Sequence, residues 1–410
     1  MSDRLRTPAI ATAVLAVAAL LTPAAEAERP GTGWFTSWAQ SQQNLAPVTL
    51  HDQSLRMITR LSQGGSAVRI RVQNTFGKQP LTIDRTTVAI SAGWAAVEST
   101  RDLTFGGRRA VTIPAGGETW SDRTTLNTVP GNDIAVSMHV AGDVVPGRHE
   151  SAFRDNYLTP PGSGEHTTDS GAAYTQKVQS TYVVSAVDVY NPRLRGTVVP
   201  FGSSVVDGVG STNCGPGCTE LGTSKRWTDV LARRIVAELP RDSQLAVANA
   251  GISGTTSAIC PRTPAAFVGL DALSRLERDV LALHGVTDVI YYYGTNDLAN
   301  GCTANDILAS YRTVFGRLRA AGIAVHVTPI TSRLGYSDQN NVDRHAVNDF
   351  VKRGSDCSDS CTSLMDFDQV LEDPIRPNSI NPPYDTGDGV HSNIKGQQAI
   401  ADYIALKALV

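Results

Sequence analysis

Two adjacent serines, Ser203 and Ser204, follow a short apolar segment and are flanked by small residues. A serine hydroxyl becomes a nucleophile only when a base takes its proton, and that base needs a carboxylate to orient it. Further along the chain the stretch DGVH supplies both groups, because Asp388 stands three residues before His391. Serine, imidazole and carboxylate are together the side chains that nucleophilic acyl transfer requires.

The oxyanion that forms during acyl transfer needs hydrogen-bond donors that are already in place. The stretch NAGISG at 249–254 offers backbone amides, and GTND at 294–297 offers the side-chain amide of Asn296. A side-chain amide donates without titrating. Each stretch is common in loops when taken alone. Their joint occurrence, each after a predicted strand or before a predicted helix, favours acyl transfer.

The second part of the chain must position these groups, and it alternates between strand and helix patterns. Strands are predicted at 196–201, 245–250, 286–294 and 323–330, and helices at 226–239, 270–283, 304–322 and 394–409. This alternation predicts a mostly parallel sheet with helices on both faces, a three-layer α/β/α sandwich. In such a sheet the functional site lies at the carboxyl ends of the strands.

The preceding part, from about 34 to 190, has a period of two. In the stretch IAVSMHV, for example, Ile134, Val136, Met138 and Val140 share one face. Gly, Pro, Asn and Asp separate many such short segments, which predicts an all-β sandwich or jelly-roll-like domain. The chain is therefore expected to have a β-rich N-terminal domain at 28–192 and an α/β domain at 193–410.

The first 27 residues are typical of a secretory signal peptide. Arg4 and Arg6 precede the apolar run 9–21, and the small residues AEA follow at 25–27. The apolar run is too short for a comfortable membrane span. We therefore expect cleavage after Ala27 and a secreted, extracellular protein.

The composition restricts the classes of partner. The net charge is −3, and only 18% of the residues are charged, so nothing in the overall electrostatics indicates a nucleic acid or an anionic membrane surface. No stretch after the predicted signal peptide is long and apolar enough to span a membrane. The sequence does not indicate an oligomeric state.

All six cysteines lie in the second half of the chain, and an even number in an exported protein favours disulfides. The spacing predicts the pairs Cys214–Cys218 and Cys357–Cys361, which leaves Cys260–Cys302. No clustering of ligands at set spacings indicates a metal site.

The four stretches, in this order, resemble the blocks of the SGNH superfamily of GDSL-type serine esterases and lipases. FGSSVVDG at 201–208 is similar to the first block, NAGISG to the second, YGTND to the third and DGVH to the last. The resemblance covers about 195–410. The β-rich part resembles the N-terminal domain of two-domain secreted bacterial members, some of which act on polysaccharides.

The resemblance implies a role for each residue that matches a block. Ser204 is the nucleophile, His391 the base and Asp388 the carboxylate that orients it. The oxyanion donors are the amide of Ser204, the amide of Gly254 and the side chain of Asn296. No cofactor is implied.

The sequence departs from the family pattern at Ser203, where the family usually has aspartate. Pro200 is expected to mark the end of the first strand of the sheet, because a central strand tolerates proline poorly. Asp207 is expected to cap the segment that follows it. The seven remaining histidines are interpreted as surface or packing residues.

These observations together predict a secreted serine esterase that hydrolyses carboxylic esters through an acyl-enzyme. The expected substrates carry O-acyl groups, above all acetyl, on carbohydrate or a small metabolite. A lipase or phospholipase, or an acyltransferase with the same triad, are alternatives. A further alternative is a glycan-binding protein with a decayed hydrolase domain. Four tryptophans of the β-rich part are either core or a sugar-stacking platform: Trp34, Trp38, Trp94 and Trp120.

Overall fold

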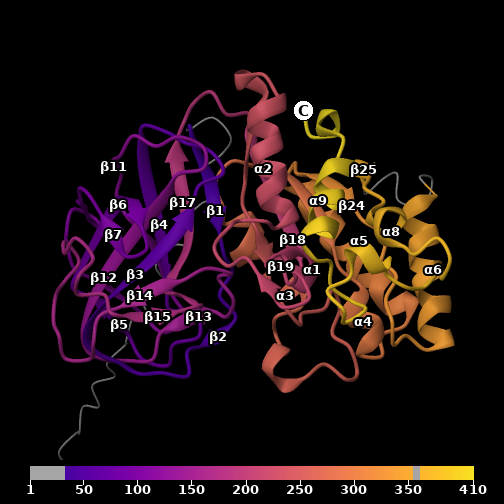
Figure 1. Ribbon diagram of the computed structural model, residues 1–410, viewed down its shortest axis with the longest axis horizontal. Coiled ribbons are helices and arrows are strands. Elements are labelled where there is room, and N and C mark those ends of the chain that lie inside the picture. Colours follow the sequence, from indigo (N-terminus) through magenta and orange to yellow (C-terminus); the bar gives the residue numbers. More distant parts are fainter. Residues whose placement is uncertain (1–32, 354–360) are drawn as a thin grey trace, which may run out of the picture.

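The computed structural model describes residues 33–353 and 361–410. An all-β region lies beside a region of mixed helices and strands, and the change between them falls between Tyr190 and Gly196 (Figure 1). The predicted signal peptide lies outside the described residues. Within the described part of the chain, none of the helices has both the length and the apolar character needed to cross a membrane.

Among the described residues, the strand pairs of the N-terminal region are all antiparallel, which confirms the all-β expectation. One sheet has the strands β1 (Trp34–Ala39), β17 (Val184–Tyr190), β4 (Ala67–Gln73) and β10 (Glu118–Trp120), with β11 (Thr124–Thr125) also paired to β4. A second has β15 (Gln176–Val178), β14 (Asn156–Leu158), β3 (Leu50–Arg60), β12 (Asp133–Val144), β6 (Arg85–Gly93) and β7 (Ala96–Val97), with β8 (Arg101–Leu103) also paired to β6.

Two smaller sheets complete this region. One has β16 (Thr181–Tyr182), β13 (Gly147–His149) and β2 (Asn44–Leu45), and the other has β5 (Leu81–Ile83) and β9 (Val111–Ile113). The alternating residues of β12 are all buried in one core together with residues of β3, β4 and β17. The period-two pattern therefore identified the buried face correctly. A jelly-roll-like order of the strands stays a prediction.

The C-terminal region is built on a parallel sheet, as the alternation of strand and helix predicted. Its order is β21 (Leu245–Val247), β18 (Gly196–Gly202), β23 (Val286–Tyr292), β24 (Ala324–Val327) and β25 (Ser363–Leu364), and β22 (Ala250–Gly251) also pairs with β18. A small antiparallel hairpin, β19 (Asn213–Gly215) with β20 (Cys218–Thr219), lies outside this sheet.

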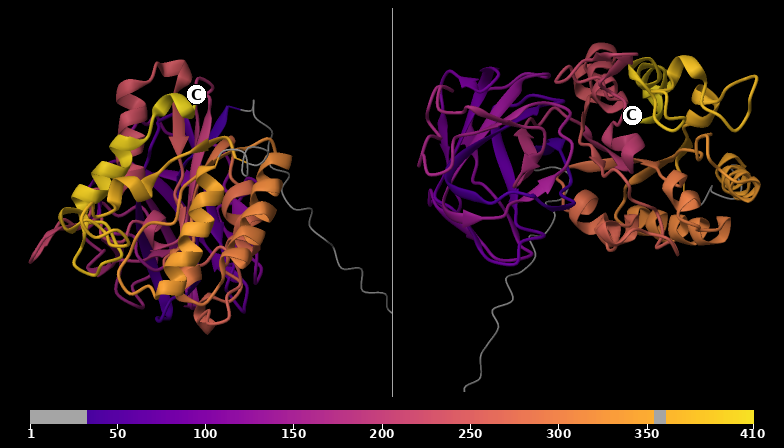
Figure 2. Two further views of the ribbon diagram at one scale, coloured as in Figure 1. Left: turned by 90° about the vertical axis from the view of Figure 1, so that its right-hand side faces the viewer. Right: turned by 60° about the horizontal axis from the view of Figure 1, so that its bottom comes forward.

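Helices cover both faces of the parallel sheet (Figure 2). On β23, alternate side chains point to opposite faces. Tyr291 and the following Tyr293 pack with α3 (Ala272–Leu276), α5 (Ala304–Ala320) and α6 (Asp338–Lys352). Ile290 and Tyr292 pack with α2 (Trp227–Glu238), α8 (Phe367–Leu371) and α9 (Ile394–Tyr403). All three tyrosines are buried, as expected of core residues.

Short helical turns make up most of the remaining elements. They are α1 (Ser204–Asp207), α4 (Thr295–Ala299), the π-helical turn η3 (Glu277–Leu281), and the 3₁₀ turns η1 (Arg241–Ser243), η2 (Ala265–Phe267), η4 (Pro382–Tyr384) and η5 (Leu406–Ala408).

Pro200 lies inside β18, which continues to Gly202, so the expectation that it ends the strand is wrong. The neighbouring ladder is interrupted at the same level, because β21 pairs with β18 up to Val198 and β22 pairs with it from Phe201. The missing N–H of Pro200 therefore costs no ladder bond on that side.

Two of the three predicted disulfides are present among the described residues, Cys214–Cys218 and Cys260–Cys302. The first closes the β19–β20 hairpin. The second ties the loop after β22 to the segment after α4. The third predicted pair involves Cys357, which lies outside the described residues.

Candidate active site

Ser204 stands at a sharp turn between strand β18 and helix α1. The N–H of Asp207 donates to the carbonyl of Ser203 at 2.9 Å, and the N–H of Gly208 donates to the carbonyl of Ser204 at 3.0 Å. These bonds close the turn within one helical revolution. The turn points the Ser204 side chain away from the strand, at the carboxyl edge of the parallel sheet.

The structure brings Ser204, His391 and Asp388 together. His391 Nε2 lies 2.9 Å from Ser204 Oγ, and His391 Nδ1 lies 2.6 Å from Asp388 Oδ2. The loop that carries His391 ends in α9, whose first turn is capped by the side chain of Asn393.

Asp388 is held in its ionised form. Partial burial by itself raises the pKa of this carboxyl, but hydrogen bonds from the His391 side chain and from the N–H groups of Val390 and His391 lower its pKa to about 2. An ionised carboxylate only accepts, so Nδ1 of His391 carries the proton. Nε2 is then an acceptor for the Ser204 hydroxyl, which is the arrangement that general-base catalysis requires.

The donors expected for an oxyanion lie around the same turn. In the described part of the chain, the N–H groups of Ser204 and Gly254 make no hydrogen bond to the protein. The Asn296 side-chain amide donates to the carbonyl of Thr255 at 2.9 Å, which attaches Asn296 to the loop that carries Gly254.

The position of residue 254 requires glycine. Its φ is +84°, and an added Cβ would come within 2.3 Å of the Phe267 ring. A side chain there would strain the backbone and collide with the aromatic ring. The amide of Gly254 therefore keeps its orientation only with glycine at this position.

A buried arginine that the sequence analysis did not single out fixes two strand ends beside the site. The guanidinium of Arg275 donates to the carbonyls of Gly202 and Ala250, each at 2.8 Å, and to Asp279 at 2.9 Å. Gly202 ends β18 and Ala250 begins β22. Nothing local in the sequence distinguishes Arg275 from a surface arginine of an amphipathic helix.

Asp207 does not cap the following segment, so that expectation is wrong. Its carboxylate is buried and accepts hydrogen bonds from the N–H of Ser253 at 3.2 Å, from Ser253 Oγ at 2.6 Å and from His149 Nε2 at 3.0 Å. His149 comes from the N-terminal region, more than fifty residues earlier in the chain. Sequence patterns carry no signal for such a distant partner.

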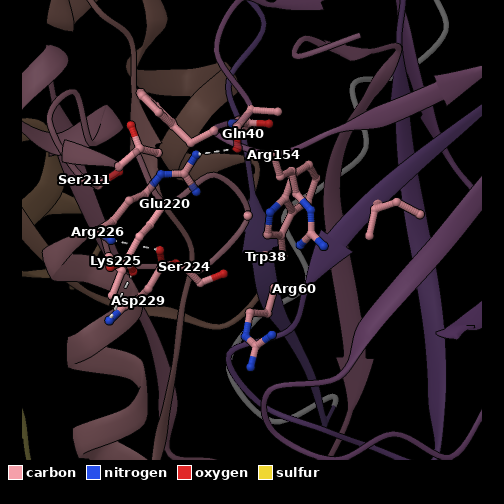
Figure 3. Close-up of a pocket in the computed structure, with 15 residues that line it drawn as sticks. Trp38, Gln40, Arg60, Arg154, Ser211, Glu220, Ser224, Lys225, Arg226 and Asp229 are labelled. Atoms are coloured by element: carbon pink, nitrogen blue, oxygen red, sulfur yellow. Dashed lines mark hydrogen bonds and ion pairs between the residues drawn. The ribbon is translucent and has the colours of Figure 1, made fainter. Parts of the chain in front are cut away.

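A separate cleft lies between the two regions and is drawn in Figure 3. Trp38, Arg60 and Arg154 of the N-terminal region face Arg226 and Asp229 of the C-terminal region across it. Neither Ser204 nor His391 lines this cleft. Arg154 pairs with Asp133 through both terminal nitrogens, at 3.0 and 3.1 Å. The cleft is thus part of the junction between the regions and lies apart from the candidate nucleophile.

One group of potential metal ligands occurs in the described part of the chain, formed by Cys260, Asp297 and Cys302. The two sulfur atoms are joined in a disulfide and are not thiolates. Burial raises the pKa of Asp297, which accepts hydrogen bonds from the N–H and hydroxyl of Ser257. The group is explained by its role in anchoring a loop.

The tryptophans of the N-terminal region differ in their surroundings. Trp34 is buried, and Trp120 packs edge to face against the His284 ring. Trp94 is 76% exposed. The core alternative therefore describes Trp34, and the sugar-stacking alternative stays a prediction for Trp94.

Residues 201–399 match the model of the GDSL-like Lipase/Acylhydrolase family. No curated protein sequence matches the chain.

Several solved structures are similar to about half of the chain. A carbohydrate acetylesterase from Sinorhizobium meliloti is 17% identical with a TM-score of 0.40, over 52% of this chain and 98% of its own. The aryl esterase of M. smegmatis is 17% identical with a TM-score of 0.39, over 50% and 95%. A psychrotrophic esterase from Pseudoalteromonas sp. is 20% identical with a TM-score of 0.35, over 51% and 93%.

The two adjacent serines should respond differently to substitution. Ser204→Ala removes the hydroxyl that faces His391 and should lower kcat for ester hydrolysis on the order of 10⁶-fold. Ser203→Ala is the matched control, because the buried Ser203 hydroxyl has no hydrogen-bond partner among the described residues. It should change kcat by less than about threefold, since no interaction is lost. Steady-state kinetics on both variants tests this, and an active Ser204→Ala variant would contradict it.

Proposed function

We propose that this chain works through an acyl-enzyme on Ser204. The premise is that residues 201–399 belong to the GDSL-like lipase/acylhydrolase family, which makes the chain a carboxylic ester hydrolase. The observation that carries the proposal is the continuous line of contacts from Ser204 Oγ to His391 Nε2 and from His391 Nδ1 to Asp388. It supplies nucleophile, base and orienting carboxylate in one place.

The proposed reaction has two steps. Ser204 Oγ attacks the ester carbonyl carbon while His391 Nε2 takes its proton, and the oxyanion is held by the amides of Ser204 and Gly254 and by Asn296. When the intermediate collapses, the C–O bond to the alcohol breaks and His391 donates the proton to the leaving oxygen. A water molecule then attacks the acyl-enzyme with His391 again as base, which releases the acid and restores Ser204.

The proposed substrates are O-acyl esters, above all acetyl esters, of carbohydrates or small metabolites. Support comes from the loops beside the site. Between β22 and α3, which flank the Gly254 loop, the only helical element is the three-residue turn Ala265–Phe267. Residues 328–337, which precede α6, contain no helix. These described segments provide no amphipathic lid helix of the kind that would suit an aggregated lipid substrate.

We also propose that the protein is exported. The basic start, the short apolar run and the small residues before Glu28 support this proposal. The two disulfides among the described residues agree with it, because disulfides persist in oxidising compartments.

The substrate proposal predicts a dependence on acyl chain length. Purified protein should hydrolyse p-nitrophenyl acetate with the highest kcat/KM, and kcat/KM should fall through butyrate and octanoate to palmitate. It should also release acetate from an acetylated oligosaccharide. The Ser204→Ala variant is the control for background hydrolysis. A maximum at octanoate or palmitate would contradict the acetyl proposal in favour of a lipase. Absence of hydrolysis with every ester would contradict the proposed function and favour a glycan-binding protein.

The export proposal predicts the N-terminus of the mature protein. Full-length chain expressed in a bacterium that secretes through the same type of signal should be recovered from outside the cytoplasm, with Glu28 as its first residue by mass spectrometry. Recovery from the cytoplasm with the first 27 residues intact would contradict the proposal.

A further inference from the structure

We propose that the N-terminal β region supplies a positioning residue to the active site: His149, whose side chain holds Asp207 and, through it, both the turn that carries Ser204 and the loop that carries Gly254. This inference rests on the proposed function of Ser204. It extends that function by making the β region part of the catalytic unit.

His149 occupies a closed environment between the two regions. It ends β13, which pairs with β16 and β2 inside the β region. Its side chain is 0% exposed, and the Asp207 side chain is 2% exposed. Nδ1 lies 2.7 Å from the carbonyl oxygen of Ser41, and Nε2 lies 3.0 Å from Asp207 Oδ1.

The two partners determine the charge of the ring. A backbone carbonyl only accepts hydrogen bonds. Burial by itself raises the pKa of Asp207, but His149, Arg226 and Ser253 together lower it below its usual value. The ionised carboxylate also only accepts, so both ring nitrogens of His149 must donate, which requires the imidazolium. The bond to Asp207 is therefore charge-assisted and stronger than a neutral one.

Asp207 connects His149 to both parts of the site, the turn that carries Ser204 and the loop that carries Gly254. It is the last residue of α1 and stands three residues after Ser204. Its second oxygen, Oδ2, accepts from the N–H and the hydroxyl of Ser253, which directly precedes Gly254. One carboxylate thus spans the nucleophile turn and the oxyanion loop. Without His149 that carboxylate is a buried charge without its cation, and the structure around it must shift or admit water.

The β region also restrains Gly208, the residue after Asp207, and it does so through Arg226. Arg226, labelled in Figure 3, donates to the carbonyl of Ala152 at 3.1 Å. Its aliphatic part covers Gly208, where an added Cβ would come within 2.4 Å of Arg226 Cγ. Residues 149–152 of the β region therefore restrain residues 207 and 208 through two separate contacts.

A second buried His–Asp pair joins the same two regions far from Ser204. His284 Nδ1 of the C-terminal region lies 2.7 Å from Asp188 Oδ2 of β17, although not in line for a hydrogen bond. His284 precedes β23 at the amino edge of the sheet, whereas Ser204 lies at the carboxyl edge. The length of the strand separates the two edges by about 20 Å. This pair is the matched control for a general effect of joining the regions.

The test uses the full chain with four variants: His149→Gln, Asp207→Asn, the double variant with both changes, and His284→Gln. Each is measured for kcat and KM on p-nitrophenyl acetate, for the rate of inactivation by a fluorophosphonate, and for Tm. His149→Gln should lower kcat and the inactivation rate by about 10- to 100-fold each, with KM within about twofold, because the site is misplaced but substrate binding is retained. His284→Gln should leave kcat within about twofold of the wild-type value, even if its Tm falls as much as that of His149→Gln.

The double variant separates positioning from folding. It replaces the buried ion pair by two neutral amides and leaves no orphaned charge, so it should recover part of the kcat that His149→Gln loses. If His149→Gln does not fold, Asp207→Asn alone should still show the loss of kcat at unchanged KM. Equal losses of kcat in His149→Gln and His284→Gln, or normal kcat in a folded His149→Gln, would overturn the inference. A wild-type protein without activity on any ester would instead overturn the proposed function, and this inference with it.

Discussion

The contact between Ser204 Oγ and His391 Nε2, at 2.9 Å, is the interaction on which the rest of the structure depends, and it joins residues 187 positions apart in the sequence. A proton can pass between these atoms only while the distance and the ring orientation are kept. The parallel sheet brings Ser204 and His391 together, because β18 ends at the same edge of the sheet where the loop before α9 lies. Asp388 then fixes the ring through Nδ1, so that one nitrogen donates and the other faces the serine.

Around this contact, buried charges anchor loops that have little regular structure. Asp207 holds Ser253, Asp297 holds Ser257, and Arg275 holds the carbonyls of Gly202 and Ala250. In each case a charged side chain satisfies polar groups that would otherwise be buried unpaired. Two of these side chains also belong to buried ion pairs, Asp207 with His149 and Arg275 with Asp279. Loss of one partner of such a pair leaves a buried charge, which typically costs about 3–5 kcal/mol. The positions of the loops around the site thus depend on these buried electrostatic contacts.

Much of this site could be predicted from the sequence, because its parts are local. Strand–helix alternation predicted the parallel sheet, and the order of four short stretches placed Ser204, Gly254, Asn296 and His391 at its edge. The contacts made between distant segments were not predictable. Helix α6 was missed because its sequence is polar and buries few side chains: Arg344, Val347, Asn348 and Val351. His149 was interpreted as a surface or packing residue, since no local pattern reveals that its partner, Asp207, lies in the other region of the chain.

The most direct test of the account is covalent labelling of the active protein with a fluorophosphonate, followed by peptide mapping of the adduct. The account predicts one adduct per chain, on Ser204, and complete loss of ester hydrolysis in proportion to labelling. The Ser203→Ala variant should be labelled in the same way and the Ser204→Ala variant not at all. An adduct on Ser203 or on any other residue, or full hydrolytic activity in a protein that takes up no label, would contradict the central claim that Ser204 is the nucleophile.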